Sequence, residues 1–123
     1  MQVRLTDREL DVMTVLWDRG SGTVTEVRAD LADELAYTTV LTVLQTLQEK
    51  GFVRHTGEGK AHRYHPLVAR EVAERSAVNR LVSSLFDGSP ELLMTHLMTE
   101  QPLSAAELRR LRKLLDSRLK GGE

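Results

Sequence analysis

Three threonines stand close together near the middle of the chain, at the start of a segment with helical periodicity. Thr38 and Thr42 are four residues apart, so they share one face of a helix, and Thr39 lies beside them. A threonine hydroxyl can donate or accept a hydrogen bond at a base edge, and its methyl can pack on a thymine methyl. Because threonine is a mediocre helix former, this outward-facing cluster costs stability without helping a core. We predict that these three residues contact DNA bases; a merely solvated face, with Thr39 as a substitute N-cap, is the alternative.

Basic side chains follow this cluster. Between residues 36 and 67 there are four Lys or Arg residues against two Glu residues, and three of the four histidines lie there too. Such a local excess is what a DNA-backbone footprint looks like, although Lys and Arg also protect exposed edge strands. The predicted phosphate contacts are Tyr37, Lys50, Arg54, Lys60 and Arg63. If the four cations act in two copies, roughly eight contacts predict a log–log salt slope of about −7.

Patterns for metal or enzymatic chemistry are weak. The chain has no cysteine, and no HExxH or paired His–carboxylate motif occurs. His62 and His65 are three apart in an expected strand, so they point to opposite faces. No nucleophile stands in a G-x-S-x-G pattern. We therefore expect no metal, no cofactor and no enzymatic activity.

Helix starts and stops place these residues on elements. Three Ser/Thr-x-x-Glu capping boxes occur, at Thr6–Glu9, Thr23–Glu26 and Ser104–Glu107. The patterns predict helices over residues 7–19, 25–34 and 37–50, the first with Leu10, Met13, Leu16 and Trp17 on its inner side.

A change of period from 3.6 to 2 follows the third helix. Residues 52–56 and 61–66 read as strands joined by the glycine-rich turn at residues 57–60, and a short strand near residues 22–24 would complete a small sheet. Three helices followed by a hairpin predict a winged helix-turn-helix over residues 1–67, within a mainly α fold that has one small β-hairpin.

The remaining residues, 68–123, read as further helices over about 69–86, from Pro90 onward and over 105–119. Each is too short to be stable alone, so its leucines need a partner surface. Folding back on the winged domain is one solution, and pairing with a second copy about a two-fold axis is the other, which we favour. The predicted dimerisation residues are Leu81, Leu85, Leu92, Leu93, Leu97, Leu108, Leu111 and Leu115.

Bulk composition limits the size of the core, the location of the protein and the class of its partners. At 123 residues and 41% hydrophobic residues the chain can bury a modest core, and no apolar run or signal-like N-terminus is present, so we expect a cytoplasmic protein. Net charge is −1, and residues 1–67 hold eight basic against ten acidic residues. This balance keeps open a rival function: a winged-helix module that binds proteins and not DNA.

Three segments resemble the penicillinase-repressor family of BlaI/MecI-type transcriptional regulators. They are LTDRELDVMTVLW, LAYTTVLTVLQTLQEKGFVRH and KAHRYHPLV, and the likeness covers about Leu5 to Leu119. The resemblance implies repression by a homodimer on a palindromic operator in double-stranded DNA, often over β-lactamase or penicillin-binding-protein genes. The family's base-reading positions correspond to Thr38, Thr39 and Thr42.

The resemblance also implies a protease partner. Members of the family can be inactivated by a regulatory protease that cuts an Asn-Phe pair in the dimerisation domain. The matching position, and hence the implied proteolytic site, is His96-Leu97, a different pair. Copper-responsive relatives carry cysteine motifs near the C-terminus, and the absence of cysteine disfavours that branch.

Overall fold

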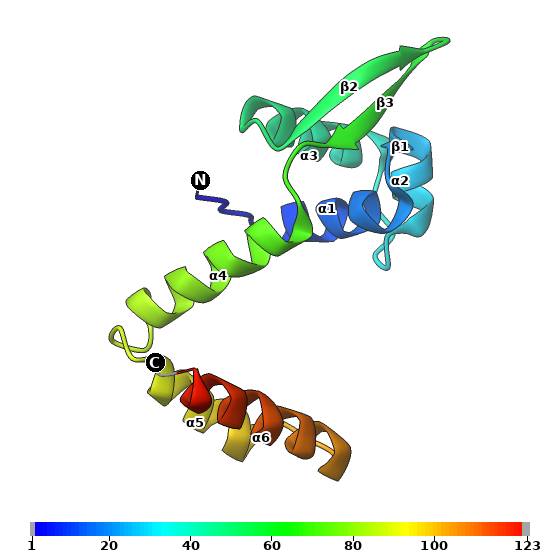
Figure 1. Ribbon diagram of the computed structural model, residues 1–123. Helices are drawn as coiled ribbons and strands as arrows, with labels where there is room; N and C mark the ends of the chain where they lie inside the picture. The colour runs from blue at the N-terminus through cyan, green and yellow to red at the C-terminus, as the bar shows by residue number, and fades with distance from the viewer. Residues whose placement is uncertain (1, 122–123) are drawn as a thin grey trace. The chain divides into compact units, whose positions relative to one another are not determined.

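The computed structural model describes residues 2–121, and within them helices alternate with a small sheet (Figure 1). In chain order the elements are α1 (Asp7–Arg19), β1 (Gly22–Thr23), α2 (Val24–Asp30), α3 (Tyr37–Glu49), β2 (Val53–Glu58), β3 (Ala61–Pro66), α4 (Arg70–Ser84), α5 (Pro90–Glu100) and α6 (Ala105–Lys120). The chain divides into two compact units between Asn79 and Arg80, so the division falls inside α4.

The first unit is built on three helices whose apolar faces share one core. Met13 and Leu16 of α1, Val27 of α2 and Leu44 and Leu47 of α3 are completely buried. Thr6 and Thr23 cap α1 and α2 through full capping boxes, which fix where each helix begins. The packed helices present the N-terminal end of α3 at the surface.

The sheet has the order β1-β3-β2 and is antiparallel throughout. Arg63 of β3 lies between Thr23 of β1 and Thr56 of β2, so β2 is an edge strand. Strands β2 and β3 form a hairpin whose turn is Gly59-Lys60, and we call residues 53–66 the wing. Gly59 has φ +61°, a conformation that glycine adopts without strain.

The start of α4 is anchored to the first unit. The indole N–H of Trp17 donates to the carbonyl of Val68 at 2.8 Å, and Leu67 N–H donates to the carbonyl of Phe52 at 2.8 Å. Farther along α4, the hydroxyl of Ser76 exchanges hydrogen bonds with the backbone of Val3 at 3.0 and 3.1 Å. The first structural unit therefore continues past residue 67. Residue 67 is where the sequence predicts the end of the winged domain.

The element bounds follow the predictions, except that α2 ends early and β2 continues to Glu58, so that the turn is Gly59-Lys60 and not residues 57–60. Helix α2 ends at Asp30 and not near Glu34, because Leu31 is already extended at φ −72° and ψ 141°. Leu10 was predicted to face inward and is 46% exposed. The inner stripe of α1 runs instead through Glu9, Val12, Met13 and Leu16, so the side chain that joins the apolar stripe is a carboxylate.

The second unit contains the end of α4 together with α5 and α6. Ser89 caps α5 by accepting the Leu92 N–H at 3.1 Å, and Ser104 caps α6 through a capping box. Neither α5 nor α6 has a buried residue, although both are rich in leucine. None of the helices in residues 2–121 combines the length and the apolar character needed to traverse a lipid bilayer.

Candidate nucleic-acid interface

The N-terminal end of α3 is open to solvent. Tyr37, Thr38, Thr39 and Thr42 are all exposed, whereas Val40 on the opposite side is fully buried. Ala36 is the N-cap residue and supplies no side-chain hydrogen bond; its carbonyl accepts the N–H groups of Thr39 and Val40. The first turn also has no acidic side chain. The first turn therefore sets no negative charge of its own against an anionic ligand.

The three threonines differ in what their hydroxyls do. The Thr42 hydroxyl donates to the carbonyl of Thr38 at 2.9 Å, so its proton is used inside the helix and only its lone pairs remain free. Among the described residues, neither the Thr38 hydroxyl nor the Thr39 hydroxyl makes a hydrogen bond. These two hydroxyls can each donate and accept toward a ligand, whereas Thr42 can accept and offer its methyl.

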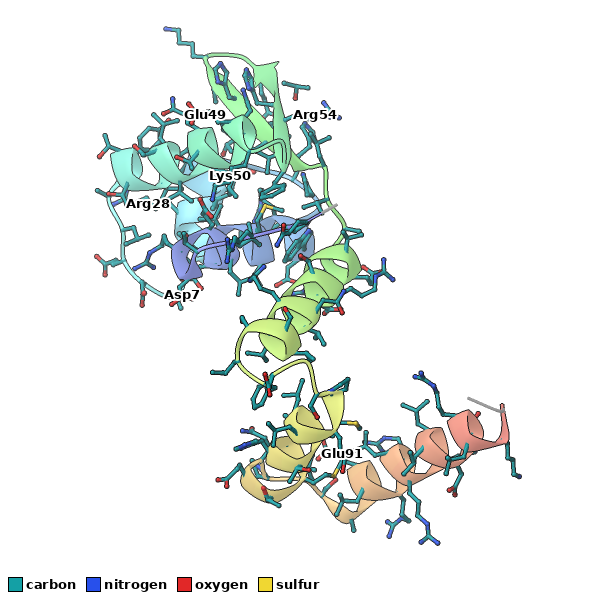
Figure 2. All side chains as sticks on the ribbon, turned by 90° about the vertical axis from the view of Figure 1, so that its left-hand side faces the viewer. Asp7, Arg28, Glu49, Lys50, Arg54 and Glu91 are labelled. Atoms are coloured by element: carbon teal, nitrogen blue, oxygen red, sulfur yellow. The ribbon has the colours of Figure 1, made fainter. Side chains whose placement is uncertain are left out.

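Two cations of the wing are free. Arg54 lies on the edge strand β2 (Figure 2) and Lys60 in the turn, and both are exposed. In the described part of the chain, neither side chain has an ion-pair or hydrogen-bond partner. Their charges are consequently available to a ligand.

Lys50 is engaged within the protein. Its ammonium lies 2.8 and 2.9 Å from the two carboxylate oxygens of Glu9, between α3 and α1 (Figure 2). Burial alone would raise the pKa of Glu9, but the hydrogen bonds from Lys50 and from the Thr6 backbone outweigh it and leave the pKa below its ordinary value. This pair joins the start of α1 to the end of α3; phosphate contact by Lys50 stays a prediction.

Arg63 is engaged as well. Its Nε lies 2.7 Å from Glu58 Oε1 on the neighbouring strand, and its Nη1 lies 3.0 Å from Glu26 Oε1 on α2. Glu58 and then Glu26 raise the pKa of Arg63, which is therefore charged throughout the accessible pH range. The structure thus separates the four cations among the predicted phosphate contacts into two free ones, Arg54 and Lys60, and two paired ones.

The histidines of the wing lie on two faces. The rings of His55 and His62 stack at 4.3 Å between centroids, and His55 Nδ1 is within hydrogen-bonding distance of Gln48 on α3. His65 lies on the other face, where its Nε2 is 2.9 Å from the Thr56 hydroxyl. No cluster of three or more metal-ligating side chains occurs within residues 2–121.

The predicted dimerisation residues lie on α4, α5 and α6, except Leu85, which is in the turn directly after α4. Six of them are exposed by 40% or more, and Leu93 and Leu111 are half-buried. An apolar groove runs between α5 and α6, lined mainly by Met94, Met98, Leu108, Leu111, Leu114 and Leu115. The implied proteolytic site, His96-Leu97, lies inside α5, where the His96 ring is 5.4 Å from that of Phe86.

Sequence reasoning missed the acidic partners of the interface. Glu9 and Glu26 were recognised as capping-box residues, but each also holds a cation from a distant segment, Lys50 and Arg63 respectively. Glu58 was placed in the turn and counted among the acids of this region, but its pairing with Arg63 was not predicted. The sequence did offer one signal. The cations lie at the end of α3 and on the wing and two of the acids lie on α1 and α2, and a winged fold packs these elements together.

Comparison with known proteins now assigns the family. A profile described as "Penicillinase repressor" matches residues 5–117. The transcriptional regulator BlaI of Mycobacterium tuberculosis (strain ATCC 25618 / H37Rv) is 37% identical over 116 residues, covering 91% of this chain and 83% of that protein. The penicillinase repressor of Bacillus licheniformis is 28% identical over 119 residues, covering 92% of this chain and 90% of that protein.

A solved structure agrees with this result. The solution structure of the Bacillus licheniformis BlaI monomeric form in complex with the blaP half-operator matches with a TM-score of 0.50 and 30% identity. The match covers 58% of this chain and 90% of that one. By profile, sequence and fold, the chain belongs to the penicillinase repressor family.

Proposed function

We propose that this protein is a DNA-binding transcriptional repressor that acts as a homodimer on a palindromic operator. DNA binding is supported above all by one observation: the BlaI structure solved on a half-operator matches 58% of this chain in fold, with 30% identity. The exposed end of α3, with two hydroxyls free of internal partners, supports the same conclusion. In this arrangement α3 is the recognition helix.

The chemistry of this end suits the major groove. The N-terminal residues of a recognition helix meet base edges, and short side chains let the helix backbone come close. Thr38 and Thr39 would hydrogen-bond to bases, and Thr42 would accept a bond or pack its methyl on thymine. Tyr37, which is 46% exposed, would hold a phosphate at the helix entrance. Arg54 and Lys60 would neutralise backbone phosphates from the wing.

The proposal of a homodimer rests on the exposed apolar surface of α5 and α6. A leucine-rich pair of helices without a single buried residue leaves a large apolar area in water, which is unfavourable for an isolated chain. Pairing of these helices across a two-fold axis would cover it and present two recognition helices to one duplex. On this proposal residues 1–67 bind DNA and residues 68–123 dimerise.

The same proposal includes the regulated genes and the way in which repression ends. A curated relative is named for repressing penicillinase, which supports β-lactam-resistance genes as targets. Cleavage at His96-Leu97 by a regulatory protease would require α5 to unwind locally, because both residues lie within the helix Pro90–Glu100. A protease binds an extended segment, so the stability of α5 would control this step.

A salt titration of duplex binding tests the function. Arg54 and Lys60 in two copies make about four phosphate contacts, for which the log–log slope of affinity against salt is about −4. A slope near −7 would mean that Lys50 and Arg63 leave their partners to join them. A flat response would rule out the repressor and favour the rival, a winged-helix module that binds proteins.

Selection of bound genomic fragments tests the symmetry. The protein is mixed with sheared genomic DNA, and the retained fragments are sequenced. We expect an inverted repeat whose half-sites lie one or two helical turns apart, since each recognition helix enters a major groove on the same side of the duplex. A single unrepeated site would contradict the dimeric arrangement.

A further inference from the structure

The guanidinium of Arg63 has five N–H groups, and internal acceptors surround all of its nitrogens. Nε lies 2.7 Å from Glu58 Oε1, and Nη2 lies 3.0 Å from Glu58 Oε2, which makes a two-pronged pair. Nη1 lies 3.0 Å from Glu26 Oε1 and 3.2 Å from the Ser21 hydroxyl, and Nη2 also lies 3.3 Å from Glu26 Oε2. Four of these five contacts are hydrogen bonds, so four of the five N–H groups are already used inside the protein.

These acceptors come from separate elements. Glu58 lies on β2, next to the wing turn, whereas Glu26 is in the first turn of α2 and Ser21 precedes β1. Glu26 also pairs with Arg19 at the end of α1, at 3.3 Å. Arg63 on β3 therefore links the wing to the helix that precedes the recognition helix, and through Glu26 to α1.

Both carboxylates are held in their charged form. The N–H of Thr23 and then Arg63 lower the pKa of Glu26, and Arg63 lowers the pKa of Glu58. Moving Arg63 to a phosphate would leave Glu58 without a cation and Glu26 with Arg19 alone, both beside a polyanion. Like charges at that distance oppose binding.

We infer that Arg63 is a positioning residue, which braces the wing against α2 so that Arg54 and Lys60 meet the DNA backbone, and that it does not contact phosphate itself. This inference rests on the proposed function. It makes Glu26 and Glu58 contributors to DNA binding, although they carry the same sign of charge as the ligand. From their charge alone, both carboxylates would be expected to weaken DNA binding.

The test removes the acids and keeps the arginine. Glu58→Gln, and the double variant Glu26→Gln/Glu58→Gln, are nearly isosteric, and glutamine still fits the capping box at residue 26. The brace predicts weaker operator binding, roughly threefold for the single and roughly tenfold for the double variant. A phosphate-contacting Arg63 predicts tighter binding for both, because the variants remove negative charge and free the guanidinium.

Two further variants separate charge from geometry. Glu49→Gln removes an exposed acid at the end of α3 (Figure 2) that has no ion-pair partner in the described residues. The affinity of this variant for operator DNA should therefore stay level or rise slightly. Arg63→Lys keeps the charge but loses the planar fork that joins two carboxylates. The brace predicts that Arg63→Lys binds about as weakly as the double acid variant, whereas a phosphate contact predicts near-normal binding.

Hydrogen exchange of the free protein supplies a readout that needs no DNA. Wing amides over residues 53–66 should exchange several-fold faster in Arg63→Lys and in the double variant, and at the normal rate in Glu49→Gln. Unchanged exchange, or tighter DNA binding by the acid variants, overturns the brace. If the unaltered protein binds no duplex while wing exchange still responds as stated, the proposed function fails and the structural brace stands.

Discussion

At the scale of single residues, two capping-box glutamates serve two purposes. Glu9 completes the cap of α1 and also holds Lys50 at the end of α3, and its side chain is only 7% exposed. Glu26 completes the cap of α2 and holds Arg63. Glu107 shares the capping motif but has no cation partner in the described residues. The first two acids therefore join local helix starts to the tertiary arrangement of the DNA-binding unit.

Glu9→Gln should destabilise the first unit by about 1–2 kcal/mol, because a charge-assisted pair to Lys50 is lost at a site where the acid is buried. The measurement is the free energy of unfolding in urea at neutral pH. Leu10→Gln, next to it and 46% exposed, is the control and should change stability by less than about 0.5 kcal/mol.

The same pair predicts a pH dependence. The folded pKa of Glu9 is below its ordinary value of 4.5, so the pair contributes fully above that pH and its contribution is lost as the pH falls through the lower folded pKa. Unfolding free energies between pH 6 and pH 3 should fall more steeply for the unaltered protein than for Glu9→Gln. Parallel curves of unfolding free energy against pH would mean that Lys50 does not lower the pKa of Glu9.

Thr39 and Lys60 should affect DNA binding in different ways. Thr39→Ala removes a hydroxyl without an internal partner from α3, so we expect a loss of about 1–3 kcal/mol in discrimination between operator and scrambled duplex. Lys60→Ala removes a free charge from the wing turn and should weaken both duplexes alike, with a salt slope about one unit smaller per copy. Equal effects of the two variants on discrimination would contradict the assigned roles.

At the scale of elements, the sequence predicted the framework of the first unit well. A capping box with apolar periodicity identified α1, apolar periodicity identified α3, and the change to a period of two identified the wing. The end of α2 was placed about four residues too late, because Leu31 continues the apolar pattern after the backbone has become extended. Leu10 was assigned to the core because the pattern did not reveal that Glu9 would occupy the inner stripe.

The partners of the site were harder to predict than its framework. Arg63 and Glu26 are 37 positions apart, and Lys50 and Glu9 are 41 apart. Periodicity reports which face of an element a residue occupies, but not which charge on another element it meets. Residue types therefore indicated a basic surface, and only the packed arrangement distinguishes the free cations from the paired ones.

The wing turn offers a matched pair of glycine substitutions. Gly59 has φ +61°, so Gly59→Ala should cost about 1 kcal/mol in the turn although no atom lies within 4 Å of the added methyl. Gly57→Ala has equally open surroundings and no positive φ, so it should be tolerated or slightly stabilising. Hydrogen exchange of wing amides should therefore quicken in Gly59→Ala alone. The same response in both variants would show that space, and not backbone conformation, limits the turn.

At the scale of the whole molecule, the two units present opposite kinds of surface. The first has a closed core of Val, Leu, Met and aromatic side chains, whereas α5 and α6 of the second leave their leucines and methionines exposed. Helices of 11 and 16 residues are marginal in water without tertiary packing. On the proposed dimer, the stability of the second unit depends on protein concentration while that of the first does not.

Leu115→Asp should therefore separate dimerisation from DNA recognition. Leu115 is 56% exposed and lines the groove between α5 and α6, so a carboxylate there would be buried without a partner if the groove is the dimer surface. We expect the dimer to weaken by at least about 2 kcal/mol, roughly thirtyfold in dissociation constant, measured by sedimentation equilibrium.

Ser117→Asp is the matched control, because it adds the same charge to α6 two positions away, about 200° around the helix from Leu115. It should sediment like the unaltered protein. On DNA, Leu115→Asp should lose affinity for the full palindrome and keep the weaker affinity for one half-site, since α3 and the wing are untouched. If both variants sediment alike, the groove is not where two copies meet; if Leu115→Asp also loses half-site binding, the two units do not act independently.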